Sequence, residues 1–339
     1  MKKIRLSILD QSHVRLGSTT EQALQETRTL AVLADQLGYE RFWVSEHHNI
    51  PNIAGSTPEV LIAYLAGQTR HIRLGAAGIM LPNHSTLKVA ENFRMLEALF
   101  PGRIDLGIGR APGGDRLTAR LLNPQNSFSE SEFIQQIKDL KHFISDHAEP
   151  GSVQEKVKAM PQAETVPPVW LLTSSGGSAQ LAAWFGTALS FAQFINPNGG
   201  PEAVAQYRAN FRPSAELKAP EANFSIFAFC SEDDAVIERW KAEFDYRLLH
   251  IERGRDTPIP SYEEIEQIEY MPDEQLRINY NRGRMICGTP ESMRQQIEAL
   301  CAQYGVNEIV LSTIAEDAAA RMESFRLLAK EFRLEPRHS

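Results

Sequence analysis

The sequence has 339 residues, 42% of them hydrophobic, which suffices for the core of one (β/α)8 barrel with insertions. Its 43 acidic and 35 basic side chains give a net charge of −8, which argues against nucleic acid or an anionic membrane as partner and favours a small-molecule ligand. The three cysteines show no disulfide or zinc spacing, and no signal peptide or membrane-spanning run is recognisable, so we expect a soluble, cytoplasmic protein.

Short apolar runs rich in β-branched and aromatic residues predict eight strands. They cover residues 4–9, 41–45, 72–79, 104–109, 169–172, 187–191, 224–229 and 308–311. Helical spacing of apolar residues lies between most of them, as in 20–37 with a Thr20 cap, 58–69, 87–99 and 131–147. Alternation of strand and helix predicts an α/β fold, a TIM (β/α)8 barrel.

Two segments are too long for simple connections. Residues 112–167 follow the fourth strand, and residues 252–284 lie between the seventh and eighth strands. Loops of this length in a compact domain are usually functional, so we interpret both as insertions that cover the mouth of the barrel. Neither shows a composition break, and we expect residues 1–339 to form a single domain.

Polar residues follow the predicted strands at their carboxyl ends, where the active sites of such barrels lie. Arg110 directly follows the fourth strand, IDLGIG, and its guanidinium matches a phosphate, although taken alone such an arginine more often forms a surface ion pair. The fifth strand runs into Ser174, Ser175, Gly176, Gly177 and Ser178, followed by a helical pattern. Hydroxyls and free amides at a helix N-terminus favour an anion, although Ser174 or Ser175 could simply cap the helix. Together the two strand ends predict a cup for a monophosphate.

Two adjacent histidines follow the second strand, in the motif Glu46-His47-His48. Neighbouring side chains in an extended segment point apart, so this pair is a poor metal site and we expect no metal ion. One histidine is expected to be structural and bonded to the backbone. The other could act as an acid, a base or a hydrogen-bond donor near neutral pH.

Two stretches of the sequence carry a resemblance to a known protein family, the block FWVSEHHN and the run from STPEVLIAYLAG through RLGAAGIMLPNHS to RIDLGIGRAPGGD. They closely resemble the bacterial luciferase-like family of flavin-dependent monooxygenases, in particular its single-gene, non-luminescent branch. VPPVWLLTSSGGSAQLAAWFG and VNEIVLST fit the same pattern, so the resemblance covers nearly the whole chain. It implies a TIM barrel that binds reduced FMN (FMNH2) delivered by a separate NAD(P)H-dependent flavin reductase. Oxygen then adds to the flavin, and the resulting hydroperoxide oxygenates a small organic substrate. The resemblance also implies a homodimer that pairs through the helices after the second and third strands.

The resemblance also assigns roles to individual residues. It gives Arg110 and the serine cup (Ser174, Ser175 and Ser178, with Gly176 and Gly177 between them) to the flavin phosphate, and it makes His47 the catalytic histidine. Ala77 and Gly78 match the place where the family carries a non-prolyl cis peptide bond against the flavin ring.

Two positions depart from the luminescent members of the family. Gly109 stands where those enzymes carry a reactive cysteine, so light emission is not expected. Ser174 replaces an acidic residue of the luminescent subunits, so details of phosphate binding are expected to differ.

Three other readings remain. A deazaflavin-dependent hydride-transfer enzyme would use the same phosphate rim, and a non-catalytic flavin-binding protein would bind FMN without turnover. A phosphosugar isomerase or aldolase would need a lysine or carboxylate at a strand end, where no lysine falls and Asp10 is the carboxylate outside the Glu46 motif.

Phe191 and Phe194 after the sixth strand are more typical of core than of a pocket wall.

Overall fold

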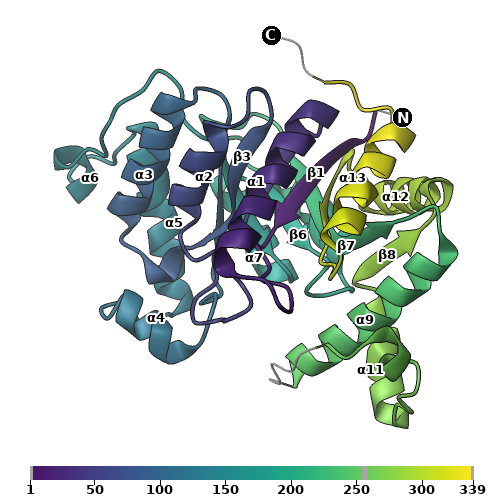
Figure 1. The fold of residues 1–339 in the computed structure, drawn as a ribbon. Helices are drawn as coiled ribbons and strands as arrows, with labels where there is room; N and C mark the ends of the chain where they lie inside the picture. Colours follow the sequence, from purple (N-terminus) through teal and green to yellow (C-terminus); the bar gives the residue numbers. More distant parts are fainter. Residues whose placement is uncertain (1–2, 254–258, 337–339) are drawn as a thin grey trace.

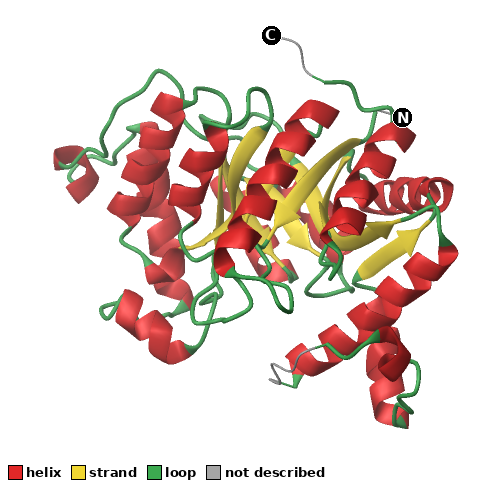
Figure 2. Cartoon of the chain, viewed as in Figure 1, coloured by secondary structure: helices red, strands yellow, loops and turns green. Residues whose placement is uncertain are grey.

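The computed structural model describes residues 3–253 and 259–336, and its strands form a closed parallel barrel surrounded by helices (Figure 1 and Figure 2). The strands are β1 (Arg5–Asp10), β2 (Arg41–Val44), β3 (Arg73–Met80), β4 (Ile104–Gly109), β5 (Val169–Thr173), β6 (Ala188–Ala192), β7 (Ala222–Cys230), β8 (Met285–Gly288) and β9 (Glu308–Ser312). Strands β1 to β7 pair in chain order, β7 pairs with β9, and β9 returns to β1, always in parallel. The predicted TIM barrel is therefore confirmed.

The helices lie outside this barrel, as the red ribbons of Figure 2 show. They are α1 (Thr20–Leu37), α2 (Pro58–Ala66), α3 (Thr86–Leu99), α4 (Arg116–Leu122), α5 (Glu130–Ser145), α6 (Val153–Lys156), α7 (Gly176–Phe185), α8 (Gly200–Asn210), α9 (Asp234–Glu252), α10 (Tyr262–Ile265), α11 (Pro272–Arg282), α12 (Pro290–Tyr304) and α13 (Ala318–Glu331), with a 3-10 turn at Leu81–Asn83. Helix α1 is capped one residue earlier than predicted, because the Thr19 hydroxyl accepts a hydrogen bond from the Gln22 amide and the Gln22 side-chain oxygen accepts one from the Thr19 amide.

Strand β8 is a ninth strand that the sequence analysis missed. It pairs with the end of β7 from Phe227 to Cys230, whereas β9 pairs with β7 from Phe224 to Phe227, so the two pairings meet at Phe227. Its four residues, MICG, are too short an apolar run to distinguish from a loop by pattern.

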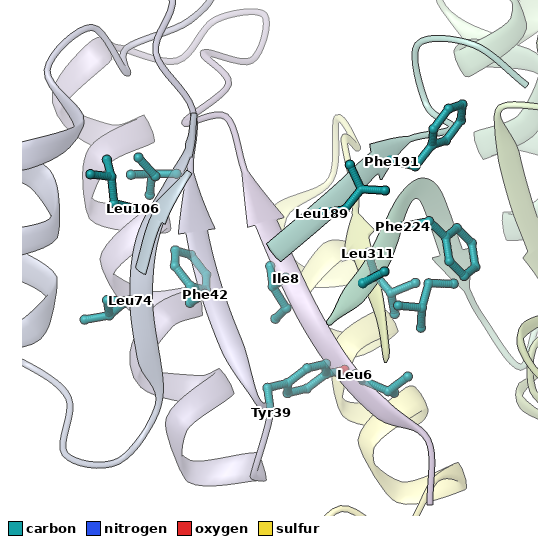
Figure 3. Close-up of a cluster of buried hydrophobic side chains, with 14 of the residues drawn as sticks. Leu6, Ile8, Tyr39, Phe42, Leu74, Leu106, Leu189, Phe191, Phe224 and Leu311 are labelled. Carbon is teal, nitrogen blue, oxygen red and sulfur yellow. The ribbon is translucent and has the colours of Figure 1, made fainter. Parts of the chain in front are cut away.

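Side chains alternate between the inside and the outside of the barrel. Leu6 and Ile8 of β1 pack with Phe42 of β2 and with helix residues in the layer between strands and helices, part of which Figure 3 shows. Leu9, the residue after Ile8, packs instead with Trp43 in a second cluster that also holds Trp170 and Val310. This period of two is the expected geometry of a strand whose two faces are both covered.

An ionic network around Arg41 fills the amino-terminal part of the barrel interior. The Arg41 guanidinium donates to Glu308 Oε1 at 2.8 Å, to Asp105 Oδ2 at 2.9 Å and to Glu221 Oε1 at 3.0 Å. Burial opposes ionisation of Asp105, but Arg41 and Arg73 overcome it and hold the pKa of Asp105 below its usual value. Charged side chains from opposite sides of the barrel are thereby joined.

No helix in the described residues is long and apolar enough to span a bilayer.

We predict that Arg41→Met lowers the free energy of unfolding by about 3–5 kcal/mol, because removing one partner leaves buried carboxylates without a counter-charge. Urea unfolding followed by circular dichroism measures this loss. The control is Arg239→Ala, which breaks an exposed pair on α9 with Glu243 and should cost less than about 1 kcal/mol. Equal losses in the two variants would contradict the role given to the Arg41 network.

Candidate active site

A cavity of about 750 Å³ lies at the carboxyl ends of the barrel strands, within the size range of small-molecule sites. Each of the eight barrel strands supplies at least one residue to its wall, among them Leu9, Trp43, Ala77, Gly109, Leu172, Ala192, Ser225 and Val310. Most of these inner wall residues are apolar. Of the predicted rim residues, His47, Arg110, Ser174, Ser175 and Ser178 line this cavity.

Arg110 lines the cavity directly after β4. Its side chain is 50% exposed, and its one ion pair within residues 3–253 and 259–336 is with Glu130 at 3.5 Å. Such an exposed pair is weak, so the guanidinium remains available to an anion.

Ser174, Ser175 and Ser178 line the same cavity as Arg110. Strands β4 and β5 are parallel neighbours, which brings their carboxyl ends to one side of the barrel. Ser175 occupies the N-cap position of α7, but its side chain makes no cap hydrogen bond, and its amide donates instead to Thr173 Oγ1 at 3.0 Å. The structure therefore does not show a serine side chain capping α7. The hydroxyls of Ser174, Ser175 and Ser178 have no hydrogen-bond partner in the described part of the chain.

Gly176 and Gly177 form the exposed first turn of α7, and neither side-chain position lines the cavity. A Cβ built on either would meet no atom within 4 Å, so packing does not require glycine here. Their contribution to the cup is through backbone amides, which have no intrahelical acceptor at a helix N-terminus.

The peptide bond between Ala77 and Gly78 is cis, as the resemblance implied. It lies where the register between β3 and β4 shifts, between Ala76 and Ile79. Ala77 lines the cavity, whereas Gly78 faces the strand layer, where an added Cβ would lie 2.4 Å from Leu172 Cδ1. A larger residue at position 78 would have to displace the Leu172 side chain and would press on the Gly107 carbonyl at 3.0 Å.

His47 lines the cavity at the end of β2. Its Nδ1 lies 3.0 Å from the hydroxyl of Ser45, and its Nε2 has no hydrogen-bond partner within the described segments. Burial lowers the pKa of His47, and the neighbouring His48 adds to this effect against the opposing charge of Glu46. The imidazole is thus neutral at pH 7 and has one nitrogen free.

His48 points away from His47 and belongs to a cluster around Glu46. Glu46 Oε1 lies 2.7 Å from His48 Nε2 and 2.9 Å from His84 Nε2, and Glu46 Oε2 accepts from the Met80 amide at 2.8 Å. Burial would raise the pKa of Glu46, but the hydrogen bonds from His84, His48 and Met80 hold it below its usual value. Burial would likewise lower the pKa of His84, but Glu46 raises it. The structural role expected for one histidine of the pair falls to His48, bonded to a carboxylate rather than to the backbone.

Glu46, His48 and His84 also lie close enough together to ligate a metal ion, with all three ligand atoms within 4.8 Å of one another. Each of these atoms already takes part in a hydrogen bond, and none of the three residues lines the cavity. We therefore interpret the group as an ionic cluster that fixes the rim. This cluster was not predicted from the sequence, because His84 is remote in the chain from the Glu46-His47-His48 motif.

The two insertions differ in what they give to the cavity. The first supplies Arg116 and Arg120 of α4, together with Phe128 and Glu130. The second, in its described part, supplies no cavity residue, and α9 and α11 project away from the barrel at the lower right of Figure 1. The four-residue spacing of Arg116 and Arg120 is visible in the sequence and would put both side chains on one face of a helix. Whether that face turns toward the cavity depends on how the insertion folds.

The remaining candidates from the sequence, Phe191, Phe194 and Asp10, lie either in the core or at the cavity wall. Phe191 is buried against Tyr304, as expected for core, whereas Phe194 lines the cavity. Asp10 accepts hydrogen bonds from the Ser12 amide and from Arg321, so it is a structural carboxylate.

Comparison with known proteins agrees with this geometry. A family model described as luciferase-like monooxygenase matches residues 4–308. The uncharacterized protein YwcH of Bacillus subtilis (strain 168) is 46% identical over 97% of this chain and 99% of its own length. N-acetyl-S-alkylcysteine monooxygenase of the same strain is 37% identical over 96% of this chain and 97% of its own length.

A solved structure shares the whole fold. The crystal structure of apo-MsnO8 superposes with a TM-score of 0.90 at 34% identity, covering 98% of this chain and 100% of that one. With the family model spanning the barrel, the chain belongs to the luciferase-like monooxygenase family of flavin-dependent enzymes.

Proposed function

We propose that the protein is an FMN-dependent monooxygenase, which receives reduced FMN from a separate NAD(P)H-dependent flavin reductase and uses O2 to oxygenate a small organic substrate. The observation that carries the proposal is the shape of one cavity, with a polar anion cup at its rim and an apolar interior. Dependence on an NAD(P)H-linked reductase would locate the reaction in the cytoplasm.

Arg110 and the serine cup fit the phosphate of FMN. The guanidinium offers a planar fork of donors, and the hydroxyls of Ser174, Ser175 and Ser178 have no hydrogen-bond partner among residues 3–253 and 259–336. The first amides of α7 add the positive end of a helix dipole. This donor set suits a phosphate, because it combines one fixed cation with several neutral donors.

The apolar interior fits the flavin ring. Ala77, Leu9, Trp43 and Val310 line the inner wall, and Trp43 is held by a hydrogen bond from its indole N–H to Asp105 at 3.0 Å. Bound reduced FMN would supply the activation of O2. The chain's own part is to orient the ring against these walls and to keep water away from it.

His47 is the residue that we propose to move a proton in this reaction. His47 lines the cavity, its Nδ1 lies beside the Ser45 hydroxyl, and its Nε2 has no partner in the described segments; the lowered pKa keeps the ring neutral at pH 7. A neutral imidazole can accept a proton and return it. Glu46 and His48 hold the adjacent backbone, so that the ring stays at the wall.

We also propose a homodimer formed through α2 and α3. These helices lie side by side on the outside of the barrel (Figure 1). Val60 and Tyr64 of α2, and Met95 and Leu99 of α3, are large apolar side chains that remain exposed. Their spacing of four residues aligns each pair along one helix face.

The function is tested by mixing the protein, loaded anaerobically with FMNH2, with O2 in a stopped-flow instrument. We expect bound flavin to reoxidise more slowly than free FMNH2, because the site excludes water. Arg110→Ala should weaken FMN binding by about 1–3 kcal/mol, the worth of a charge-assisted hydrogen bond, and Arg110→Lys should weaken it less.

The same titrations with a reduced 8-hydroxy-5-deazaflavin cofactor distinguish the proposed function from that of a deazaflavin-dependent hydride-transfer enzyme. Tight binding of that cofactor without binding of FMNH2 would contradict the proposal, and reoxidation at the free-flavin rate would favour a binding protein over an oxygenase. Unchanged FMN affinity in Arg110→Ala would remove Arg110 from the phosphate site.

The proton-transfer role requires His47 to be neutral near pH 7. We predict that its ring nitrogens titrate below the ordinary value of 6.5 and those of His84 above it, because burial dominates at His47 whereas Glu46 dominates at His84. Nitrogen-15 NMR of the imidazoles measures both, with His47→Asn and His84→Asn as assignment controls. Titration of both rings on the same side of 6.5 would be inconsistent with the cluster as described.

For the dimer, Val60→Glu combined with Met95→Glu should shift the elution of the protein in size-exclusion chromatography from twice the chain mass to the chain mass. Charges on both helices would have to be desolvated in the interface. Leu276→Glu on α11, at a residue 72% exposed, is the matched control and should leave the mass unchanged. A wild-type protein that elutes as a monomer at micromolar concentration would rule the dimer out.

A further inference from the structure

The cavity wall carries an excess of positive charge. Its formally charged residues are Arg110, Arg116, Arg120 and Glu130, so the wall has a formal charge of +2. The whole chain, by contrast, has a net charge of −8. Same-sign charge concentrated in a concave site raises the local potential and attracts anions.

The three arginines differ in their partners. Arg110 pairs with Glu130 and lines the same cavity as the serine cup, whereas the side chains of Arg116 and Arg120 form no ion pair or hydrogen bond within the part of the chain that the structure describes. One anion, the flavin phosphate of the proposed function, accounts for Arg110 and the cup. It leaves two cations of the same wall without a counter-charge.

Both unpaired arginines project from one face of α4. They are four residues apart, which aligns them on a helix, and Ala119 between them also lines the cavity. Leu117 and Leu121, each at least 70% exposed, do not line the cavity. The helix therefore directs its cations toward the cavity.

Helix α4 is held to the rim at both ends. At its start, Asp115 accepts from the Leu117 and Thr118 amides and from Asn49 Nδ2, the last at 3.0 Å. At its end, the amide of the Asn123 side chain donates to Pro82 O at 3.0 Å. The two guanidiniums are thus presented from a fixed support, next to the loops that follow β2 and β3.

We propose that Arg116 and Arg120 bind an anionic group, such as a carboxylate, on the organic substrate. This inference rests on the proposed function, since it takes the cup for the flavin phosphate, and it names the substrate class. Two guanidiniums offer planar donor pairs that match a carboxylate. The substrate is then an organic acid whose apolar part extends toward the cavity interior.

The test uses protein saturated with oxidised FMN and titrates it by calorimetry with straight-chain carboxylates from butanoate to decanoate and with the primary amides of the same lengths. The best acid should bind at least about tenfold more tightly than its amide, as expected for charge-assisted hydrogen bonds. In the double variant Arg116→Gln/Arg120→Gln this preference should disappear, while FMN affinity stays within about twofold. Arg239→Gln, on the remote surface of α9, is the matched control.

A parallel titration with FMN and riboflavin separates the two possible anions. If the double variant loses affinity for FMN but not for riboflavin, Arg116 and Arg120 serve the flavin phosphate and the inference is overturned. It is also overturned if no acid in the series is preferred over its amide in the wild-type protein, or if the preference survives in the double variant. Failure of the proposed function is recognised separately, by a wild-type protein that does not bind FMNH2 or that reoxidises it at the free-flavin rate.

Discussion

Arg41 and the carboxylates around it are the constraint on which the rest of the structure depends. A closed barrel has an interior that must be filled, and here the amino-terminal part holds one guanidinium between Asp105, Glu221 and Glu308. The network ties β2 to β4 and β9 and closes one end of the barrel, so the cavity can open at the other end alone. Trp43 links the Arg41 network to the cavity, since its indole N–H donates to Asp105 and the residue also lines the cavity.

At the carboxyl-terminal end of the barrel, where the cavity opens, the buried carboxylate of Glu46 also holds neighbouring segments together. Glu46 gathers His48, His84 and the Met80 amide, and thereby fixes the ends of β2 and β3 relative to each other. His47 stands next to this cluster but turns into the cavity, where burial keeps it neutral. The same geometry thus separates a structural histidine from one suited to proton transfer, and it supports the loop that carries Arg110.

Much of the barrel could be predicted from the sequence, because each strand of a parallel barrel is covered on both faces and reads as a continuous apolar run. The β4 run leading to Arg110 is the clearest case, with every residue buried. Strand β8 was missed because it is short and its place is set by pairing with the extended end of β7. The Thr20 cap was off by one residue, since Thr19 and Thr20 are both suitable caps by type and the Gln22 side chain decides between them.

The sequence by itself determined the family, the barrel and the rim residues that follow consecutive strands, such as Arg110 and Ser174, because chain order dictates which strand ends are neighbours. The family resemblance had already assigned the catalytic role to His47. Tertiary structure alone decided that His48 and His84 join Glu46, and that α4 turns Arg116 and Arg120 into the wall. These outcomes depend on contacts between segments remote in the chain, and local pattern carries no information about such contacts.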